Sequence, residues 1–175
     1  RTRALLGSLM TYKRLKANEE YLNGLADRLI DGFIDKGCCD VVPDYAHATT
    51  TYAICDILGI PEEHRAELLE FIGPPPSQLE GDSVFKIGPD PLMFLKDRFD
   101  EYIRERQENP CGDMLSDLAN ARFKDGSVPD PDLLSHLARF TYGAGQDTTS
   151  RLMAMAILIL CENPELQTRL RANPG

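Results

Sequence analysis

The sequence has no long run of apolar residues. Its longest mainly apolar stretch, at residues 152–161, is far shorter than the ~20 residues that a membrane-spanning helix needs. No signal peptide is recognisable at the start of the chain. The sequence therefore predicts a protein without a membrane span.

Basic residues are also in short supply. There are 19 Lys and Arg against 28 Asp and Glu, which gives a formal net charge of −9. Such a charge repels phosphate backbones and anionic membranes unless the basic residues are clustered, and here they are scattered. We therefore expect neither nucleic acid nor a membrane surface as a partner.

Spacings typical of disulfide frameworks and structural metal sites are absent. The five cysteines are odd in number and include no C-x-x-C pair, and the three histidines show no i, i+4 pairing. We expect reduced thiols, a cytoplasmic location and no metal bound by these side chains. The residues concerned are Cys38, Cys39, Cys55, Cys111, Cys161, His47, His64 and His136.

The remaining pattern is that of a folded, soluble helical chain. Its 175 residues suffice for one domain or part of one, and no internal repeat or domain boundary is visible. Apolar residues recur at three- and four-residue spacing between Gly and Pro breaks, which predicts a mainly α fold with little β structure. The expected helices cover residues 22–34, 43–59, 61–72, 92–107, 111–123 and 130–162. Turn residues at 123–127 are typical of a small hairpin.

The stretch at residues 73–91 interrupts this pattern. It opens with Gly-Pro-Pro-Pro and is rich in Gly, Pro, Ser and Asp. Long loops of this kind are often lids over a binding site, although disordered segments have the same composition. The sequence leaves both interpretations open.

The helix expected at 130–162 has an unusual centre. At 1.5 Å per residue it would span roughly 45–50 Å, and its apolar flanks predict a central, buried helix. Two glycines and five polar side chains occupy its middle, at residues 142–150. Each glycine costs about 1 kcal/mol relative to alanine in a helix interior. The small residues Gly143, Ala144 and Gly145 would let something flat and bulky lie against the backbone.

Two side chains in this centre are candidates for proton transfer. The Thr148 hydroxyl can bond the carbonyl of Ala144 and loosen the helix there. Asp147 beside it could exchange protons with solvent, so that the two form a proton relay. The spacing fits equally a helix break, with Asp147 or Thr148 capping a second helix.

Three segments together resemble one family. Ala-Gly-Gln-Asp-Thr-Thr at 144–149, within a long helix that ends in Glu-Asn-Pro-Glu-Leu at 162–166, is similar to the oxygen-binding helix of cytochromes P450. Ile-Cys-Asp-Ile-Leu-Gly-Ile-Pro-Glu-Glu at 54–63 and Arg-Thr-Arg-Ala-Leu-Leu at 1–6 are similar to two further segments of the bacterial soluble type. The resemblance covers nearly the whole chain and implies an incomplete P450-like helical domain.

The resemblance also implies residue roles. Asp147 and Thr148 fall on the acid and the alcohol that deliver protons to dioxygen. Ala144, Gly145 and Thr149 fall beside a haem group, and Arg3 falls on the arginine that pairs with a haem propionate, a charge-assisted contact. The implied reaction inserts one oxygen atom into a small apolar substrate beneath a roof at residues 71–102. The implied electron donor is of the ferredoxin and ferredoxin reductase type.

The sequence departs from the family at the iron ligand. None of the five cysteines lies in a Phe-x-x-Gly-x-x-x-Cys-x-Gly pattern, so the thiolate ligand is missing. The two Glu-x-x-Arg matches, at 62–65 and 101–104, precede the long helix, whereas the family has its pair after it. We therefore expect the central fragment of a haem-thiolate monooxygenase, inactive by itself.

Two alternatives need no haem ligand. One is an all-helical module that binds a small molecule without oxygen chemistry. The other is a helical fragment that self-associates through apolar surface left uncovered.

Overall fold

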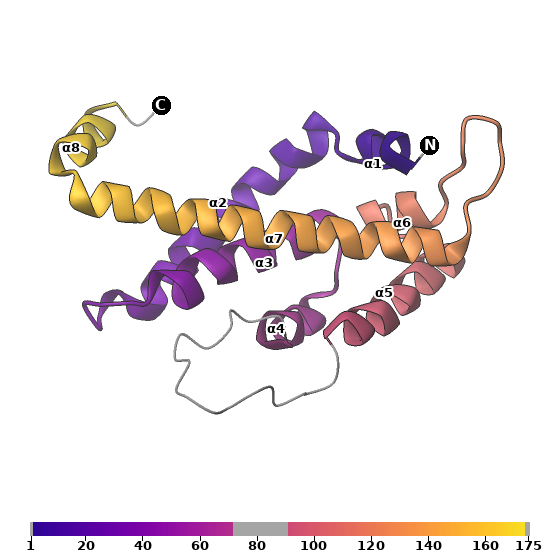
Figure 1. Cartoon of the computed structure of the whole chain (residues 1–175), viewed down its shortest axis with the longest axis horizontal. Helices are drawn as coiled ribbons and strands as arrows, with labels where there is room; N and C mark the ends of the chain where they lie inside the picture. Colours follow the sequence, from indigo (N-terminus) through magenta and orange to yellow (C-terminus); the bar gives the residue numbers. More distant parts are fainter. Residues whose placement is uncertain (1, 72–90, 174–175) are drawn as a thin grey trace.

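The computed structural model describes residues 2–71 and 91–173, which form helices joined by turns and loops (Figure 1). The mainly α prediction is confirmed, since no strand occurs among the described residues. The elements are α1 (Thr2–Leu9), α2 (Tyr12–Ile34), the π-helix η1 (Val41–His47), α3 (Ala48–Leu58), α4 (Glu62–Phe71), α5 (Pro91–Glu108), α6 (Met114–Ala119), α7 (Pro131–Glu162) and α8 (Pro164–Ala172).

The helix α7 crosses the molecule from end to end, and α8 extends from its far end (Figure 1). The elements α3, α5 and η1 pack along α7, while α2 packs on α3 and α6 packs on α5. Their shared core contains large side chains that are essentially inaccessible to solvent. These include Leu58, Ile60, Leu68, Phe99, Tyr102, Ile103, Met114, Leu115, Leu118, Leu134 and Tyr142.

The helix α2 begins ten residues earlier than the sequence predicted. Thr11 has an extended backbone and accepts a hydrogen bond from the backbone nitrogen of Arg14 at 3.3 Å, so it caps the helix. The residues that follow it, 12–20, are mostly polar and exposed. The predicted start at residue 22 was wrong because only the second half of the helix carries a recognisable apolar stripe.

The helix predicted at 43–59 is two elements. Its end is confirmed, because Gly59 stops α3 with a left-handed φ of 86°. Its first part is the π-helix η1, a rare conformation that is capped by Asp40 through the backbone nitrogen of Val42 at 3.2 Å. The π-helix was not predicted, because no sequence pattern distinguishes its wider turns.

A buried ion pair joins α5 to the start of α6 and the end of α3. Arg106 is 6% exposed, and its Nε donates to Asp113 Oδ2 at 2.8 Å while its Nη2 donates to the Gly59 carbonyl at 3.2 Å. Burial raises the pKa of Asp113, but hydrogen bonds from Ser116 and Arg106 outweigh it and hold that pKa below its ordinary value. Asp113 also caps α6, which is shorter than the predicted helix at 111–123.

Two loop predictions have different outcomes. Residues 123–127 form a turn closed by the Phe123 nitrogen and the Ser127 carbonyl at 2.9 Å, but no strands flank it in the described structure, so the hairpin was wrong. The predicted lid at 73–91 lies outside the described residues, except that Pro91 begins α5. None of the described helices is long and apolar enough to cross a membrane.

Candidate functional site

The helix α7 is continuous through its glycine-rich centre. Asp130 caps its start by accepting from the backbone nitrogen of Asp132 at 2.8 Å, and the helix ends before Asn163 and Pro164. The boundaries predicted for the long helix are confirmed. The alternative of two helices, with Asp147 or Thr148 as a cap between them, is wrong.

The Thr148 hydroxyl makes the bond predicted for it. Its Oγ1 donates to the Ala144 carbonyl at 2.8 Å, one turn earlier in α7. With its proton donated to the backbone, the oxygen keeps lone pairs that can accept a hydrogen bond from another group. In a relay, Thr148 would therefore take a proton at Oγ1 in the same step in which it gives up its own.

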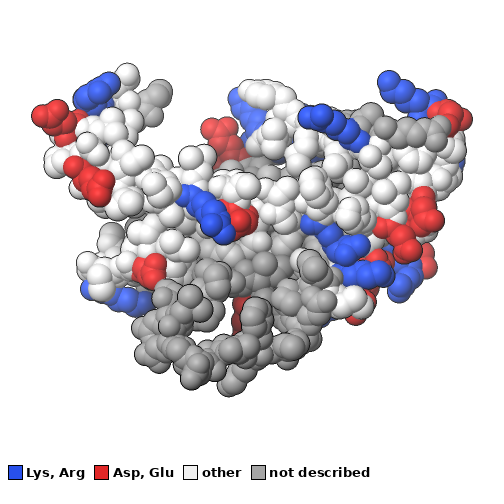
Figure 2. All heavy atoms as spheres, viewed as in Figure 1, with Lys and Arg blue, Asp and Glu red and all other residues white. Residues whose placement is uncertain are grey.

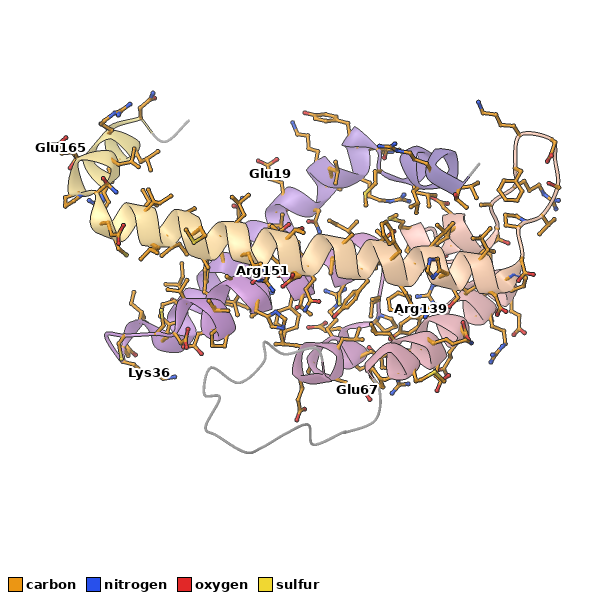
Figure 3. The ribbon with its side chains drawn as sticks, viewed as in Figure 1. Glu19, Lys36, Glu67, Arg139, Arg151 and Glu165 are labelled. Carbon is orange, nitrogen blue, oxygen red and sulfur yellow. The ribbon has the colours of Figure 1, made fainter. Side chains whose placement is uncertain are left out.

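Asp147 forms an ion pair that the sequence analysis missed. The Nε of Arg151 lies 3.0 Å from both carboxylate oxygens of Asp147, and Arg151 lies near the middle of α7 in Figure 3. The side chain of Asp147 is 67% exposed and that of Arg151 is 78% exposed, so the pair stabilises the protein by roughly 0.5 kcal/mol or less. The signal was present as an Asp and an Arg four residues apart. The pair fixes the carboxylate weakly and leaves it open to solvent.

Asp147 and Thr148 share one exposed side of α7, here termed the open face. Gly143 and Ala144 lie between them and Phe140 on this side, and large exposed apolar side chains continue along it. Those apolar residues are Phe140 (58% exposed), Leu152 (69%) and Met155 (55%). Figure 2 shows an adjoining basic and acidic pair near the middle of the surface along α7, with uncharged atoms around it and further charged side chains toward the ends of the helix.

The prediction of a central, buried helix is confirmed for the position of α7 but wrong for one of its sides in the described structure. The elements α3, α5 and η1 pack on one side of α7, where Tyr142, Gln146 and Ser150 are buried. They do not cover the open face. Thr149 is likewise exposed, one position beyond Thr148.

The two glycines of the centre have different surroundings. A Cβ added to Gly143 would meet nothing within 4 Å, whereas one added to Gly145 would lie 3.0 Å from Cδ1 and 3.3 Å from Cγ1 of Ile54 on α3. Gly145 therefore allows α7 to pack closely on α3. The sequence analysis did not predict this role, and the placement of Gly145 beside a haem group stays a prediction.

Alanine substitutions should separate these two glycines. We expect Gly143→Ala to raise the free energy of unfolding by about 1 kcal/mol, because alanine favours the helix and finds open space. We expect Gly145→Ala to show no such increase in the free energy of unfolding, since its Cβ must displace the side chain of Ile54. Urea unfolding followed by circular dichroism measures both, and adding Ile54→Val to Gly145→Ala should restore stability. Equal gains at both glycines would contradict the packing role of Gly145.

Arg3 lies apart from these residues. It is exposed on α1, which packs against α6. The structure thus brings Ala144, Asp147 and Thr148 together on the open face. It does not bring Arg3 to them, and the role predicted for Arg3 stays a prediction.

Comparison with known proteins identifies the family. The family model described as Cytochrome P450 matches residues 75–173, more than half of the 175 residues. The chain belongs to the cytochrome P450 family. The matched segment contains the whole of α7 and α8, so the resemblance noted at 144–149 and 162–166 is confirmed.

Curated P450 relatives match along almost the whole chain. The biotin biosynthesis cytochrome P450 of Bacillus subtilis is 27% identical over 99% of this chain and 44% of its own length. The vitamin D(3) 25-hydroxylase of Pseudonocardia autotrophica is 26% identical over 100% of this chain and 42% of its own length. The chain therefore spans roughly two-fifths of the length of these curated relatives.

Solved P450 structures agree with the arrangement of the helices. A substrate-free cytochrome P450 of Mycobacterium marinum superimposes with a TM-score of 0.85 and 37% identity over 99% of this chain and 39% of that one. The LnmZ cytochrome P450 hydroxylase of Streptomyces atroolivaceus superimposes with a TM-score of 0.83 and 26% identity. The match covers 98% of this chain and 47% of that one. The P450-like helical fold is thereby confirmed.

The P450 family implies haem, and the open face fits one side of such a group. Its small residues Gly143 and Ala144 lie between the exposed apolar side chains of Phe140 and Leu152, a surface that a flat macrocycle can cover. The described residues offer no cluster of three or more His, Cys, Asp or Glu that could hold a metal ion. Burial raises the pKa of Cys55 to about 12, so this thiol stays protonated and is a poor ligand.

Proposed function

We propose that the full-length protein is a haem-thiolate monooxygenase that inserts one oxygen atom from dioxygen into a small apolar substrate. Membership of the P450 family and relatives described as hydroxylases support this. The observation that carries it is the open face of α7. There an exposed carboxylate and a hydroxyl hydrogen-bonded to its own helix adjoin small residues.

Each residue of the site has a task in this proposal. Haem, when bound, would supply the binding and reduction of dioxygen. Asp147 takes protons from solvent, since its side chain is 67% exposed. Thr148 accepts a proton or a water at Oγ1 and passes its own proton onward when it leaves the Ala144 carbonyl. Ala144, Gly145 and Thr149 would lie beside the macrocycle, and Arg3 would pair with a propionate.

The thiolate ligand is assigned outside these 175 residues. No cysteine of the chain has the phenylalanine and glycine spacing that the family uses at its ligand. The chain as given is therefore proposed to be inactive alone. It forms the central part of a single P450 domain.

The proposed electron donor is of the ferredoxin and ferredoxin reductase type, and the proposed location is the cytoplasm. These two assignments rest on the resemblance and on composition.

A carbon monoxide difference spectrum tests the proposed function. We expect the 175-residue chain, with haem and reductant added, to give no thiolate-type Soret band. The full-length protein should give that band. A thiolate-type band from the chain alone would overturn the assignment of the ligand. A full-length protein whose further residues lack both a Glu-x-x-Arg helix and a Phe/Gly/Cys loop would overturn the monooxygenase proposal.

A second function is favoured by one specific observation. A cavity of about 330 Å³ lies between α2, α3 and α4, within the usual size range of small-molecule sites. Tyr21, Leu25, Arg28, Tyr52 and Arg65 contribute to its walls. Its size would suit a helical module that binds a small molecule without oxygen chemistry, although residues 143–149 do not line it. Under that alternative, the full-length protein would give no carbon monoxide band.

A further inference from the structure

A buried polar cluster anchors the centre of α7 on the side opposite the open face. Gln146 is 3% exposed, and its Nε2 donates to Thr51 Oγ1 at 3.0 Å. The same nitrogen lies 3.3 Å from Nε2 and 3.4 Å from Nδ1 of His47, which is 7% exposed at the end of η1. Gln146 directly precedes Asp147 in the chain.

His47 connects η1 to α7. It is the last residue of η1, and its ring nitrogens lie beside Gln146 on α7. Burial holds the pKa of His47 below its ordinary value, although Leu69 and the charge of Asp147 act in the opposite direction. Burial therefore favours the neutral imidazole. A neutral ring can accept from the Gln146 amide, whereas an imidazolium would repel it.

The π-helix η1 ends at this contact. The hydroxyl of Thr50 donates to the carbonyls of Ala46 and His47, both at 3.1 Å, and so supports the junction where η1 passes into α3. Single-turn π segments are uncommon and are frequent at functional sites. Here the wide turn ends on the residue that lies against Gln146.

The centre of α7 needs such an anchor because its own helix is weak. Gly143 and Gly145 each cost about 1 kcal/mol relative to alanine, and the Thr148 bond to a carbonyl competes with the helical ladder. The described structure does not cover the open face. The rotation of this segment about the helix axis, and with it the direction of Asp147 and Thr148, therefore depends on the buried side.

We propose that His47 is a positioning residue for Asp147 and Thr148, and that it acts through Gln146 to fix the rotation of α7 at residues 143–150. The inference rests on the proposed function in one respect only, that these two side chains move protons. His47 itself touches neither the open face nor a reacting group.

Amide hydrogen exchange in the full-length protein tests this inference. We expect His47→Phe and Gln146→Met each to speed exchange at residues 143–150 by about tenfold, with α2 unchanged, because opening of this segment alone becomes easier. The double variant should match either single variant, since both break one contact. His47→Gln keeps an amide that can bond Gln146, and it should restore most of the protection. The matched control is His136→Phe, an exposed histidine on α7, which should leave exchange at 143–150 unchanged.

Three outcomes would overturn the inference. They are faster exchange throughout α2 and α7 alike, additive effects of the two substitutions, and no rescue by His47→Gln. If His47→Phe does not fold, the comparison of amide exchange at residues 143–150 between Gln146→Met and His136→Phe tests the inference. The readout is independent of haem chemistry. If the substitutions do not change exchange at residues 143–150 while the full-length protein gives a normal carbon monoxide band, only the positioning role is contradicted. If exchange rises at residues 143–150 but the full-length protein gives no such band, only the proposed function is contradicted.

Discussion

Thr148→Ala should lower the product formed per electron pair by about tenfold or more in the full-length protein, while electron consumption changes little. The reason lies in the open face of α7. Under the proposed function, the hydroxyl of Thr148 directs the protons that Asp147 takes from solvent. Without it, a larger share of the electrons would be consumed without oxygenation of the substrate. The measurement is the ratio of product to reduced cofactor consumed, with any substrate that shifts the haem spectrum.

Two further variants identify the cause of a lower ratio. Thr148→Ser keeps a hydroxyl that can bond the Ala144 carbonyl, and it should retain most of the coupling. Thr168→Ala removes a similar bond on α8, where Oγ1 donates to the Pro164 carbonyl at 3.1 Å in an exposed position. It should leave the ratio unchanged. An unchanged ratio in Thr148→Ala would mean that Thr148 only bonds its own helix.

The part of this site that could be predicted from sequence is local. The Thr148 bond to Ala144 joins residues four apart in one helix, and the boundaries of α7 follow from Asp130 and Pro164. Such features depend on neighbours in the chain, whose geometry a helix fixes in advance. The Asp147 and Arg151 pair was equally local and was overlooked.

The rest depends on residues far apart in the chain. Gln146 meets His47 across 99 positions, and Gly145 meets Ile54 on another helix. No periodicity in one segment specifies its partner in another, and the π-helix that supplies His47 has no distinctive pattern of its own. The buried length of α7 was overestimated for a related reason. Apolar residues at 152–160 indicate that a surface is suited to burial, but the described elements do not cover it.

Gly59→Ala should lower the free energy of unfolding by at least about 3 kcal/mol, a large loss for one methyl group. Gly59 has a φ of 86°, and an added Cβ would lie 2.3 Å from Cβ and 2.5 Å from Oδ2 of Asp113. An alanine is strained at this φ by roughly 1–2 kcal/mol. It also pushes Asp113 away from Arg106, a buried pair whose separation costs roughly 3–5 kcal/mol. Urea unfolding followed by circular dichroism measures the loss.

Gly126→Ala is the matched control, because Gly126 has nearly the same φ of 84° but no atom within 4 Å of an added Cβ. It should lower the free energy of unfolding only by the conformational strain, roughly 1–2 kcal/mol.

The pH dependence of stability separates the effect of the ion pair from that of the strain. Because the pKa of Asp113 is depressed in the folded protein, its stabilising effect is present above the ordinary aspartate pKa of about 4 and fades as the pH falls through the lower folded value. The difference in free energy of unfolding between the native protein and Gly59→Ala should therefore become smaller in acid. The same difference for Gly126→Ala should stay constant. If the stability difference between the native protein and Gly59→Ala does not depend on pH, then Asp113 keeps its hydrogen bonds in the variant and backbone strain alone destabilises it.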